Sequence, residues 1–337
     1  MKTFAGILTL AFIMIFASAC SNSGSSSGST GGESGSGWQP NKRIEFVAPA
    51  TPGGGWDTTA RAMKKVLSDQ NLIKKPLTVA NKPGGSGEVG WKYLKQKGPN
   101  TLAINSSLLI TNHLLGRSDL TYKNFTPLAI LATEWEAIVV PKDSDISSLK
   151  DLMKQLKSDP KSKKIAVAPG LGNDDHLSFL KAAKAYGVGA KKLDFLVYES
   201  GGDVTNALLG HHVGAATMSV SEAKQQYKAG KLKILAVSSE ERIDGLEDIP
   251  TYKESGVDIV FPHWRGIMGP PDMTEEQIAY WDKKIGKMVK TDAWQKVLKN
   301  NEWQDFYKDS SEAKKFFKKQ VKQYKDLIET AGLSDKY

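Results

Sequence analysis

The chain has 337 residues, a hydrophobic fraction of 40% and a charged fraction of 25%, which together indicate a globular body with a sizeable buried core. Its formal net charge is +9, carried mostly by scattered lysines, and only five arginines occur. Nucleic-acid binding would require basic runs interleaved with aromatic residues and more arginine. We therefore expect a solvated basic surface and no nucleic-acid partner.

The N-terminus has the pattern of an exported protein. Residues 1–19 contain Lys2, an apolar run and then small residues, which is typical of a secretory signal and too short for a membrane span. The ending Ala-Ser-Ala before Cys20 resembles the bacterial lipobox, with alanine where leucine is commonest, and implies cleavage and lipid attachment at Cys20. The alternative is an ordinary signal with an incidental cysteine. Residues 20–37 are almost entirely serine and glycine and predict a flexible tether. We expect a protein anchored by lipid outside the cytoplasm.

The folded body begins with a strand, a glycine-rich turn and a helix. The strand is expected over Ile44–Ala48, three glycines follow at residues 53–55, and helical spacing runs from Thr58 to Ser68. Glycine permits backbone angles that other residues resist. Free amides at a helix start, together with the helix dipole, favour an anion such as a carboxylate. The turn is therefore a candidate anion site.

The same pattern recurs further along the chain. A strand at Leu77–Asn81 precedes a second glycine turn at residues 83–87, and Thr101–Ser106 forms the next strand. Repetition of strand, turn and helix predicts a parallel sheet with ligand at the carboxyl ends of its strands. The second turn has dinucleotide-fingerprint spacing, but Asn105-Ser106-Ser107 stands where the acidic ribose partner is expected, so we reject a nicotinamide site.

Two apolar strands divide the remainder into domains. A strand at residues 137–141 and another at Leu232–Ser238 are expected to carry the chain into and out of a second unit. This predicts an α/β fold in which residues 140–238 form a domain inserted into one made of residues 38–139 and 239–337, with a cleft between them. Within the inserted domain, a strand at Ile165–Ala168 precedes a glycine turn and a helix that runs to Tyr186.

Six motifs in order resemble the extracytoplasmic solute receptors of tripartite tricarboxylate transporters, and the resemblance covers residue 44 to about residue 333. The motifs are Pro-Gly-Gly-Gly-Trp-Asp at 52–57 with Arg61, Asn-Lys-Pro-Gly-Gly-Ser-Gly at 81–87, Gly-Leu-Gly at 170–172 with His176, Leu-Leu-Gly-His-His-Val at 208–213, residues 249–256, and Trp-Arg-Gly at 264–266. The resemblance implies a type II periplasmic-binding-protein fold: two α/β domains, crossing hinge strands and a central cleft.

It also implies a site. In this family backbone amides and waters at the loops after the strands hold a ligand carboxylate. The pattern carries over to Gly54, Gly55, Asp57, Thr58, Gly85, Ser86, Ser106 and Ser107 from the first domain, and to Gly170, Gly172, Asn173, Asp174, Ser200, Gly201 and Gly202 from the inserted one.

The chain departs from the family pattern in its acidic residues. Asn173-Asp174-Asp175 stands where the family usually has serine and threonine, Glu199 replaces a frequent lysine, and Gly214 replaces a frequent aspartate. Extra acid near the cleft opposes a highly charged anion such as citrate. An amine-bearing ligand such as an amino acid, or a metal-complexed di- or tricarboxylate, fits better if Asp174 or Glu199 points inward.

The alternative functions are a secreted hydrolase and an accessory that reports ligand occupancy to a membrane sensor kinase. Outside the serine- and glycine-rich tether no Gly-x-Ser-x-Gly elbow occurs, and the chain has no His-Glu-x-x-His motif or Gly-Lys-Ser phosphate loop, so we expect no enzyme, no cofactor and no protein metal site. His263 is expected either to line the cleft or to form a buried pair, and Arg265 to be an ion-pair partner. We expect a monomer that delivers a small carboxylate to membrane permease subunits.

Overall fold

The computed structural model describes residues 37–330 and 332–333. The expected signal, Cys20 and the tether before Gly37 lie outside these residues. Among the described residues, no helix is long and apolar enough to cross a membrane.

Ten strands and ten α-helices make up the part of the chain that the structure describes. The strands are β1 (Ile44–Ala48), β2 (Leu77–Asn81), β3 (Thr101–Asn105), β4 (Thr126–Pro141), β5 (Lys164–Val167), β6 (Asp194–Val197), β7 (Ala215–Ser219), β8 (Leu232–Val237), β9 (Pro262–Gly269) and β10 (Gln304–Lys308). The helices are α1 (Gly55–Asp69), α2 (Glu88–Lys95), α3 (Leu108–Leu114), α4 (Leu149–Ser158), α5 (Asp174–Ala185), α6 (Gly201–Leu209), α7 (Val220–Lys228), α8 (Glu275–Met288), α9 (Asp292–Asn300) and α10 (Ser310–Thr330). Short 3₁₀ turns lie at Gly85–Gly87, Tyr122–Asn124 and Ala190–Lys192.

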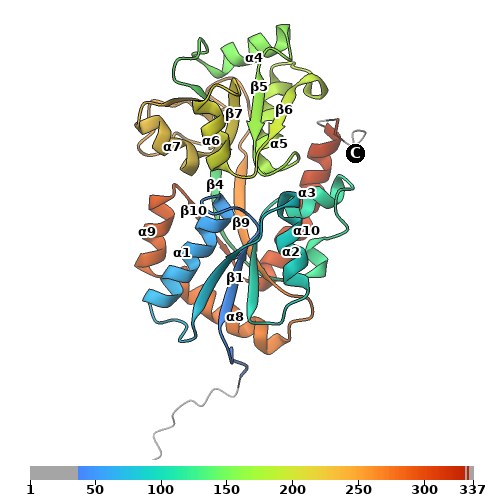
Figure 1. The fold of residues 1–337 in the computed structure, drawn as a ribbon, viewed down its shortest axis with the longest axis vertical. Helices are drawn as coiled ribbons and strands as arrows, with labels where there is room; N and C mark the ends of the chain where they lie inside the picture. Colours follow the sequence, from blue (N-terminus) through green and yellow to red (C-terminus); the bar gives the residue numbers. More distant parts are fainter. Residues whose placement is uncertain (1–36, 331, 334–337) are drawn as a thin grey trace, which may run out of the picture. The chain divides into compact units, whose positions relative to one another are not determined.

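The strands form one continuous sheet in the order β2-β1-β3-β9-β4-β7-β5-β6, with β8 and β10 also paired to β4. Strand β4 joins its two halves. The first half of β4 pairs antiparallel with β9, ending at the pair Trp135 and Pro262, and the second half pairs with β7 from Glu136 onward. Figure 1 shows β4 and β9 running between two groups of helices. We call the group with β5 to β8 and α4 to α7 the inserted lobe, and the rest of residues 37–333 the first lobe.

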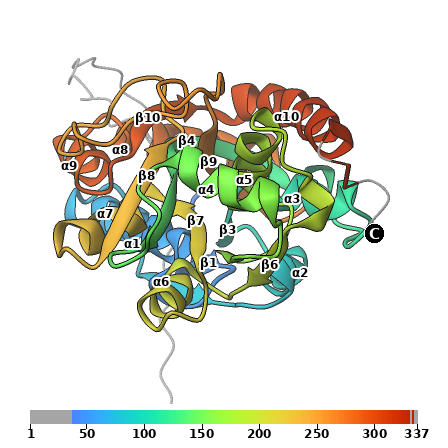
Figure 2. The ribbon, with the colours of Figure 1, turned by 90° about the horizontal axis from the view of Figure 1, so that it is seen from above.

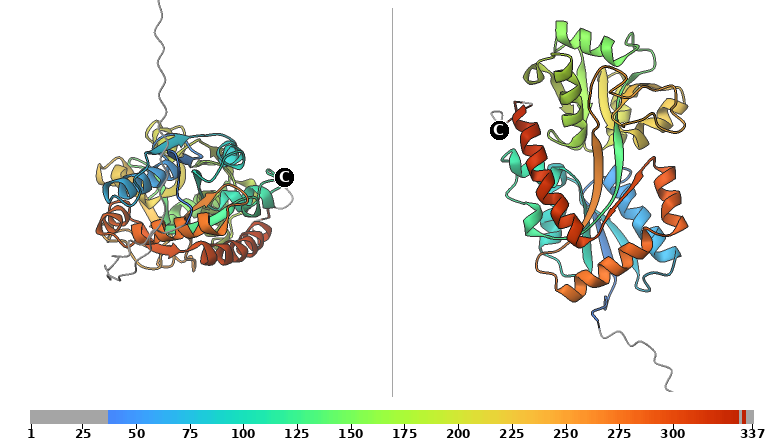
Figure 3. Two further views of the ribbon diagram at one scale, coloured as in Figure 1. Left: turned by 90° about the horizontal axis from the view of Figure 1, so that it is seen from below. Right: turned by 180° about the vertical axis from the view of Figure 1, so that it is seen from behind.

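Side-chain alternation along β4 gives the inserted lobe a core on each face of its sheet. Ile138 and Val140 pack with α4 and α5, whereas Ala137 and Val139 pack with α6 and α7. Figure 2 shows α5 and α6 on opposite sides of β7. In the first lobe, α1, α2, α8 and α9 share one core, and α10 crosses the other face beside β4 and β9 (Figure 3).

The mixed α/β architecture with crossing strands confirms the expected fold class. The crossing back to the first lobe lies later than the position near residue 238 that we expected. Strand β8 still pairs with the second half of β4, and the following segment packs Leu246 and Ile249 into the inserted-lobe core. Strand β9 then returns the chain to the first lobe. The crossing comes this late because the hydrophobic residues of the segment between β8 and β9 pack in the core of the inserted lobe.

The first helix also starts earlier than the sequence indicated. Helix α1 begins at Gly55, with Gly54 as a cap that makes no side-chain hydrogen bond. The expected start at Thr58 was wrong because glycine and tryptophan are weak helix formers, but here Trp56 is buried against Trp91. Five other tryptophans are buried as well, namely Trp91, Trp135, Trp281, Trp294 and Trp303.

Candidate functional site

A cavity of about 40 Å³ lies between the two lobes, where loops after several strands meet. Three helices begin at its wall: α1 at Gly55, α5 after its cap Asn173, and α6 after its cap Ser200. The full lining is Ala50, Gly54, Gly55, Trp56, Ser106, Leu108, Ala168, Pro169, Asn173, Asp175, Glu199, Ser200, Gly201, Glu222, His263 and Arg265. Three helix N-termini at one cavity provide partial positive charge, and Asp175, Glu199 and Glu222 bring three acidic side chains to the same cavity.

The glycine turn before α1 is braced by its own polar groups. Gly53 has a φ of 90°, and its N–H donates to Asp57 Oδ2 at 2.9 Å. The same oxygen accepts from Arg61 Nε at 2.8 Å, while Asp57 Oδ1 accepts from Asn81 at 2.8 Å. Burial alone would raise the pKa of Asp57, but these hydrogen bonds and the Arg61 charge outweigh it and hold the pKa below its usual value. The Asp57 carboxylate thus fixes the turn.

Gly55 brings the turn against a cation from the hinge. A Cβ placed on Gly55 would lie 2.3 Å from Nη2 of Arg265, so only glycine leaves room for the guanidinium. Arg265 lies on β9 and is buried, with 5% of its surface exposed. It forms an ion pair with Glu134 of β4 and donates through Nη1 to His263 Nε2 at 2.9 Å. Arg265 is therefore the ion-pair partner that we expected, and it also lines the cavity.

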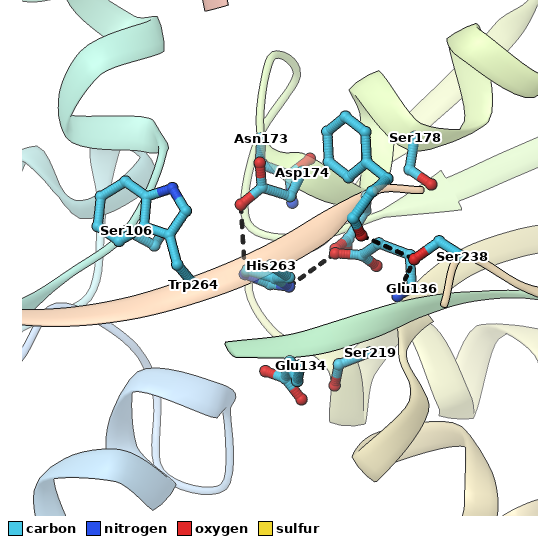
Figure 4. Close-up of polar contacts among 12 residues, drawn as sticks. Ser106, Glu134, Glu136, Asn173, Asp174, Ser178, Ser219, Ser238, His263 and Trp264 are labelled. Atoms are coloured by element: carbon cyan, nitrogen blue, oxygen red, sulfur yellow. Dashed lines mark hydrogen bonds and ion pairs between the residues drawn. The ribbon is translucent and has the colours of Figure 1, made fainter. Parts of the chain in front are cut away.

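A buried ionic cluster lies next to Arg265 in the hinge, and Figure 4 shows its members Glu134, Glu136, Asp174 and His263. Glu134 and Glu136 lie on β4, and His263 lies opposite Glu134 on β9. His263 Nδ1 is 2.6 Å from Glu136 Oε1, and His263 Nε2 is 3.6 Å from Asp174 Oδ2. His263 therefore lies between two buried carboxylates and also lines the cavity.

The start of α5 adds two more carboxylates. Asp174 is fully buried and accepts a 2.8 Å hydrogen bond from the hydroxyl of Tyr324. Asp175 accepts from the Ala168 N–H at 3.2 Å and lines the cavity. Carboxylates at the first turn of a helix are favoured by the helix dipole.

These environments change the acidity of the cluster. Burial raises the pKa of Glu136 well above its usual value, and the neighbouring Asp174 and Glu134 charges raise it further. Burial and the Glu136 charge do the same for Asp175. Burial alone would raise the pKa of Glu134, but Arg265 and His263 hold it below its usual value. The hinge therefore contains one carboxylate stabilised in its charged form and others for which the charged form is unfavourable.

Several contacts connect the lobes around the cavity. Ser86 Oγ in the first lobe donates to the Pro169 carbonyl at 3.0 Å, and Arg117 Nη1 donates to the Leu171 carbonyl at 2.5 Å. Lys224 of α7 pairs with Glu302 of the first lobe. The cavity has room for only a few water molecules, because one water needs roughly 10–15 Å³. The lobes must therefore separate for a solute to enter.

The structure brings part of the predicted site together. Gly54, Gly55, Ser106, Asn173, Ser200 and Gly201 line the cavity, and so does Glu199, which we had expected to matter if it pointed inward. The cavity lining does not include Asp57, Thr58, Gly85, Ser86, Ser107, Gly170, Gly172, Asp174 or Gly202. Of these, Asp57 braces the first turn, Ser86 bridges the lobes, and Asp174 belongs to the buried cluster.

Sequence reasoning missed Glu134, Glu136 and Glu222. A Cβ on Gly201 would lie 2.3 Å from Cδ of Glu222, so this carboxylate packs directly over the start of α6. A signal for the first two was present, because Glu134 and Glu136 interrupt an apolar strand at alternate positions and therefore lie on the same face. Charges on one face of a buried strand indicate a polar site.

The chain is similar to known proteins both in sequence and in fold. The chain is 25% identical over 301 residues to a UPF0065 protein of Cupriavidus necator, covering 88% of this chain and 89% of that one. It is similar to a TctC solute-binding protein from Polaromonas, at 27% identity and a TM-score of 0.61, covering 86% and 99% of the two chains. A Rhodopseudomonas palustris protein solved with adipate has the same fold, at 21% identity and a TM-score of 0.80, covering 87% and 98%.

The fold and the interlobe cavity match those of solute-binding receptors of the periplasmic-binding-protein class. The model of the tripartite tricarboxylate transporter family receptor matches residues 59–333, and the chain belongs to this family. Such receptors act outside the cytoplasm, bind small solutes and work with membrane transporter components. This confirms the resemblance inferred from the six motifs.

Proposed function

We propose that this receptor captures a small solute carrying both a carboxylate and a positively charged amine, as amino acids do, and delivers it to a tripartite-type membrane transporter. One observation carries the proposal: the first lobe contributes the start of α1 to the cavity wall, and the inserted lobe contributes the acidic side chains Asp175, Glu199 and Glu222. A carboxylate fits the start of α1 at Gly54 and Gly55, and an ammonium group fits Asp175, Glu199 and Glu222.

The acidic lining argues against citrate. Two or three further negative charges beside these carboxylates would be repelled in a site of low dielectric constant. An ammonium group, in contrast, gains charge-assisted hydrogen bonds there. The similar structure with adipate supports the carboxylate half of the proposal, and the acidic residues in the cavity lining support the amine half.

Matched pairs of solutes test the proposal. Malate and aspartate differ only in a hydroxyl in place of an amine, and 2-hydroxyglutarate and glutamate form a second pair. Thermal denaturation of the purified protein with each solute, in the presence of EDTA, should show a larger rise in melting temperature for the amine member, because a solute that binds only the folded state stabilises it. Citrate or the hydroxy acids giving the larger rise would contradict the proposal.

The variant Glu199→Gln sharpens this test. It keeps the shape of the side chain and removes one negative charge, so the advantage of the amine over the hydroxyl should shrink. Unchanged discrimination would show that Glu199 does not face the amine.

Anchoring and partners form the second part of the proposal. Lipid attached at Cys20 and the tether over residues 20–37 would hold the receptor, as a monomer, near membrane permease subunits. Solute closes the lobes by binding the closed form more tightly than the open one. Deleting the candidate permease should abolish solute uptake. Uptake that persists without the permease, together with a transcriptional response to the solute that requires this receptor, would favour the sensor-kinase alternative.

A further inference from the structure

We propose that Glu136, Asp175 and His263 form a binding site for one divalent transition-metal ion, such as Zn²⁺ or Mn²⁺, in the wall of the solute cavity. This inference depends on the proposed function in one respect: the ion would face the bound solute. The residues come from β4, α5 and β9, so the site lies at the hinge between the lobes.

The geometry suits a metal ion. One ligand atom from each of the three side chains lies within 4.8 Å of the other two. All three side chains are buried, with 0%, 5% and 7% of their surfaces exposed. Carboxylate oxygens together with an imidazole nitrogen form a donor set that suits Mn²⁺ and Zn²⁺.

Glu136 gives an independent indication of a ligand. Neither of its carboxylate oxygens accepts a hydrogen bond of regular geometry from the residues that the structure describes, although the side chain is fully buried. Its Oε1 faces His263 Nδ1 at 2.6 Å, and that nitrogen also lacks a regular hydrogen bond among the described residues. Buried polar atoms are normally hydrogen-bonded. The ion pair with His263 accounts for Oε1 but leaves Oε2 without a partner of regular geometry among the described residues, so Oε2 is the atom that would bind a cation.

The local charge balance supports a cation over a purely structural network. Glu134 is neutralised by Arg265. For the three remaining acids, Glu136, Asp174 and Asp175, the imidazole of His263 is then the one neighbouring group in the described cluster that can carry a compensating positive charge. Buried charges are tolerated only when paired or bound to metal. Burial raises the pKa of all three acids, and repulsion from neighbouring carboxylates raises the pKa of Glu136 and of Asp175 further, so protons are the alternative to a metal ion.

The surroundings of His263 fit a ligand role. A histidine that binds metal usually donates its second N–H to a carboxylate. With the ion on the nitrogen facing Glu136, the hydrogen of the ring moves to Nε2, which lies 3.6 Å from Asp174 Oδ2. Arg265 donates to Nε2 in the structure and would shift toward Glu134, which it already contacts.

The site has a place in solute binding. Asp175 and His263 line the cavity, whereas Glu136 lies behind them. The open coordination positions of the ion would face the solute, and a solute carboxylate could fill one of them. Glu199 and Glu222 would remain free to contact an amine. We expected no metal site from the sequence, because the three residues are separated by 39 and 88 positions and match no metal motif.

Metal titration without solute tests the proposal. The full-length protein is stripped with EDTA, desalted and titrated calorimetrically with ZnCl₂ and, separately, with MnCl₂. We expect about one equivalent of at least one ion to bind. Glu136→Gln and His263→Gln should each weaken that binding by at least about tenfold, the range reported for losing even an outer-shell partner. The matched controls Glu275→Gln and His113→Gln change exposed side chains and should leave binding unchanged.

Two results would overturn the proposal: no binding of either ion to the wild-type protein at about millimolar concentration, or binding that survives either substitution unchanged. Cooperative melting by circular dichroism establishes that each variant is folded, and if one is not, the other carries the test. Because the titration contains no solute and the solute panel contains EDTA, failure of one proposal leaves the other standing.

Discussion

The turn before α1 and the hinge cluster both carry buried charge, but they satisfy it in opposite ways. In the turn, Asp57 receives hydrogen bonds from Gly53, Arg61 and Asn81, and these donors come from the turn itself, the helix that follows it and the next strand. In the hinge, acids from β4 and α5 meet one histidine and one arginine from β9, and Glu136 has no regular hydrogen bond from the described residues. The contrast separates a carboxylate that builds the site from carboxylates that are available to a ligand.

The largest effect is expected from removing the cation of the hinge. Arg265→Met leaves Glu134 as an unpaired buried charge, which should lower the free energy of unfolding by about 3–5 kcal/mol. Urea denaturation measures this loss. Adding Glu134→Gln to the same variant should recover part of the stability, since the stranded charge is then gone. A loss below about 1 kcal/mol would show that the pair is solvated and not buried as the structure has it.

The second prediction concerns the contact between turn and hinge. Gly55→Ala places a methyl group against the Arg265 guanidinium, and overpacking of this kind costs about 1–3 kcal/mol. We expect lower stability and weaker solute binding, measured by denaturation and calorimetry. For stability, Gly54→Ala is the matched control, because a Cβ there has its nearest neighbours at 3.6 Å, an ordinary contact. Equal effects at the two glycines would refute the close approach at Gly55.

The third prediction tests whether the turn is braced by charge. Asp57→Asn removes hydrogen bonds to a charged acceptor and should cost about 1–3 kcal/mol at neutral pH. The pKa of Asp57 is lowered in the folded protein, so its contribution is complete above the ordinary aspartate pKa of about 3.9 and is lost as the pH falls through the lowered value. Denaturation at pH 7 and at pH 3 should therefore show a stability difference between wild type and variant that shrinks in acid. A pH-independent difference would mean that charge plays no part.

The smallest effect is expected at the mouth of the cavity. Ser86→Ala removes the hydrogen bond to Pro169 that links the lobes, which should weaken the closed form by about 0.5–1.5 kcal/mol. The solute-induced rise in melting temperature should fall slightly, while the stability without solute stays nearly unchanged. A larger loss without solute would assign Ser86 to the fold instead of to closure.

The glycine turn could be predicted from the sequence, whereas the hinge cluster could not. Glycine turns between strand and helix are local features, so β2, the first turn and the loops carrying Asn173 and Ser200 could be placed from their residues. Gly85 and Gly170 were expected at the cavity, but the structure places Gly170 against Ser86 and Gly85 against Glu88. Loop position alone does not determine which face of a turn meets the cavity.

The hinge cluster could not be assembled from the sequence, because β4 and β9 are brought side by side only by long-range pairing. Glu134 lies opposite His263, a separation of more than one hundred residues, and Asp175 reaches them from a third element. Burial, which shifts their pKa values, is likewise a property of the folded chain.

A crystal structure of the protein with aspartate tests the central claim most directly. The account predicts that the solute lies between the lobes, with one carboxylate at the amides of Gly54 and Gly55 and its ammonium group within hydrogen-bond distance of Asp175, Glu199 or Glu222. A solute bound outside the interlobe cavity, or bound there with its ammonium group turned away from all three acids, would contradict it.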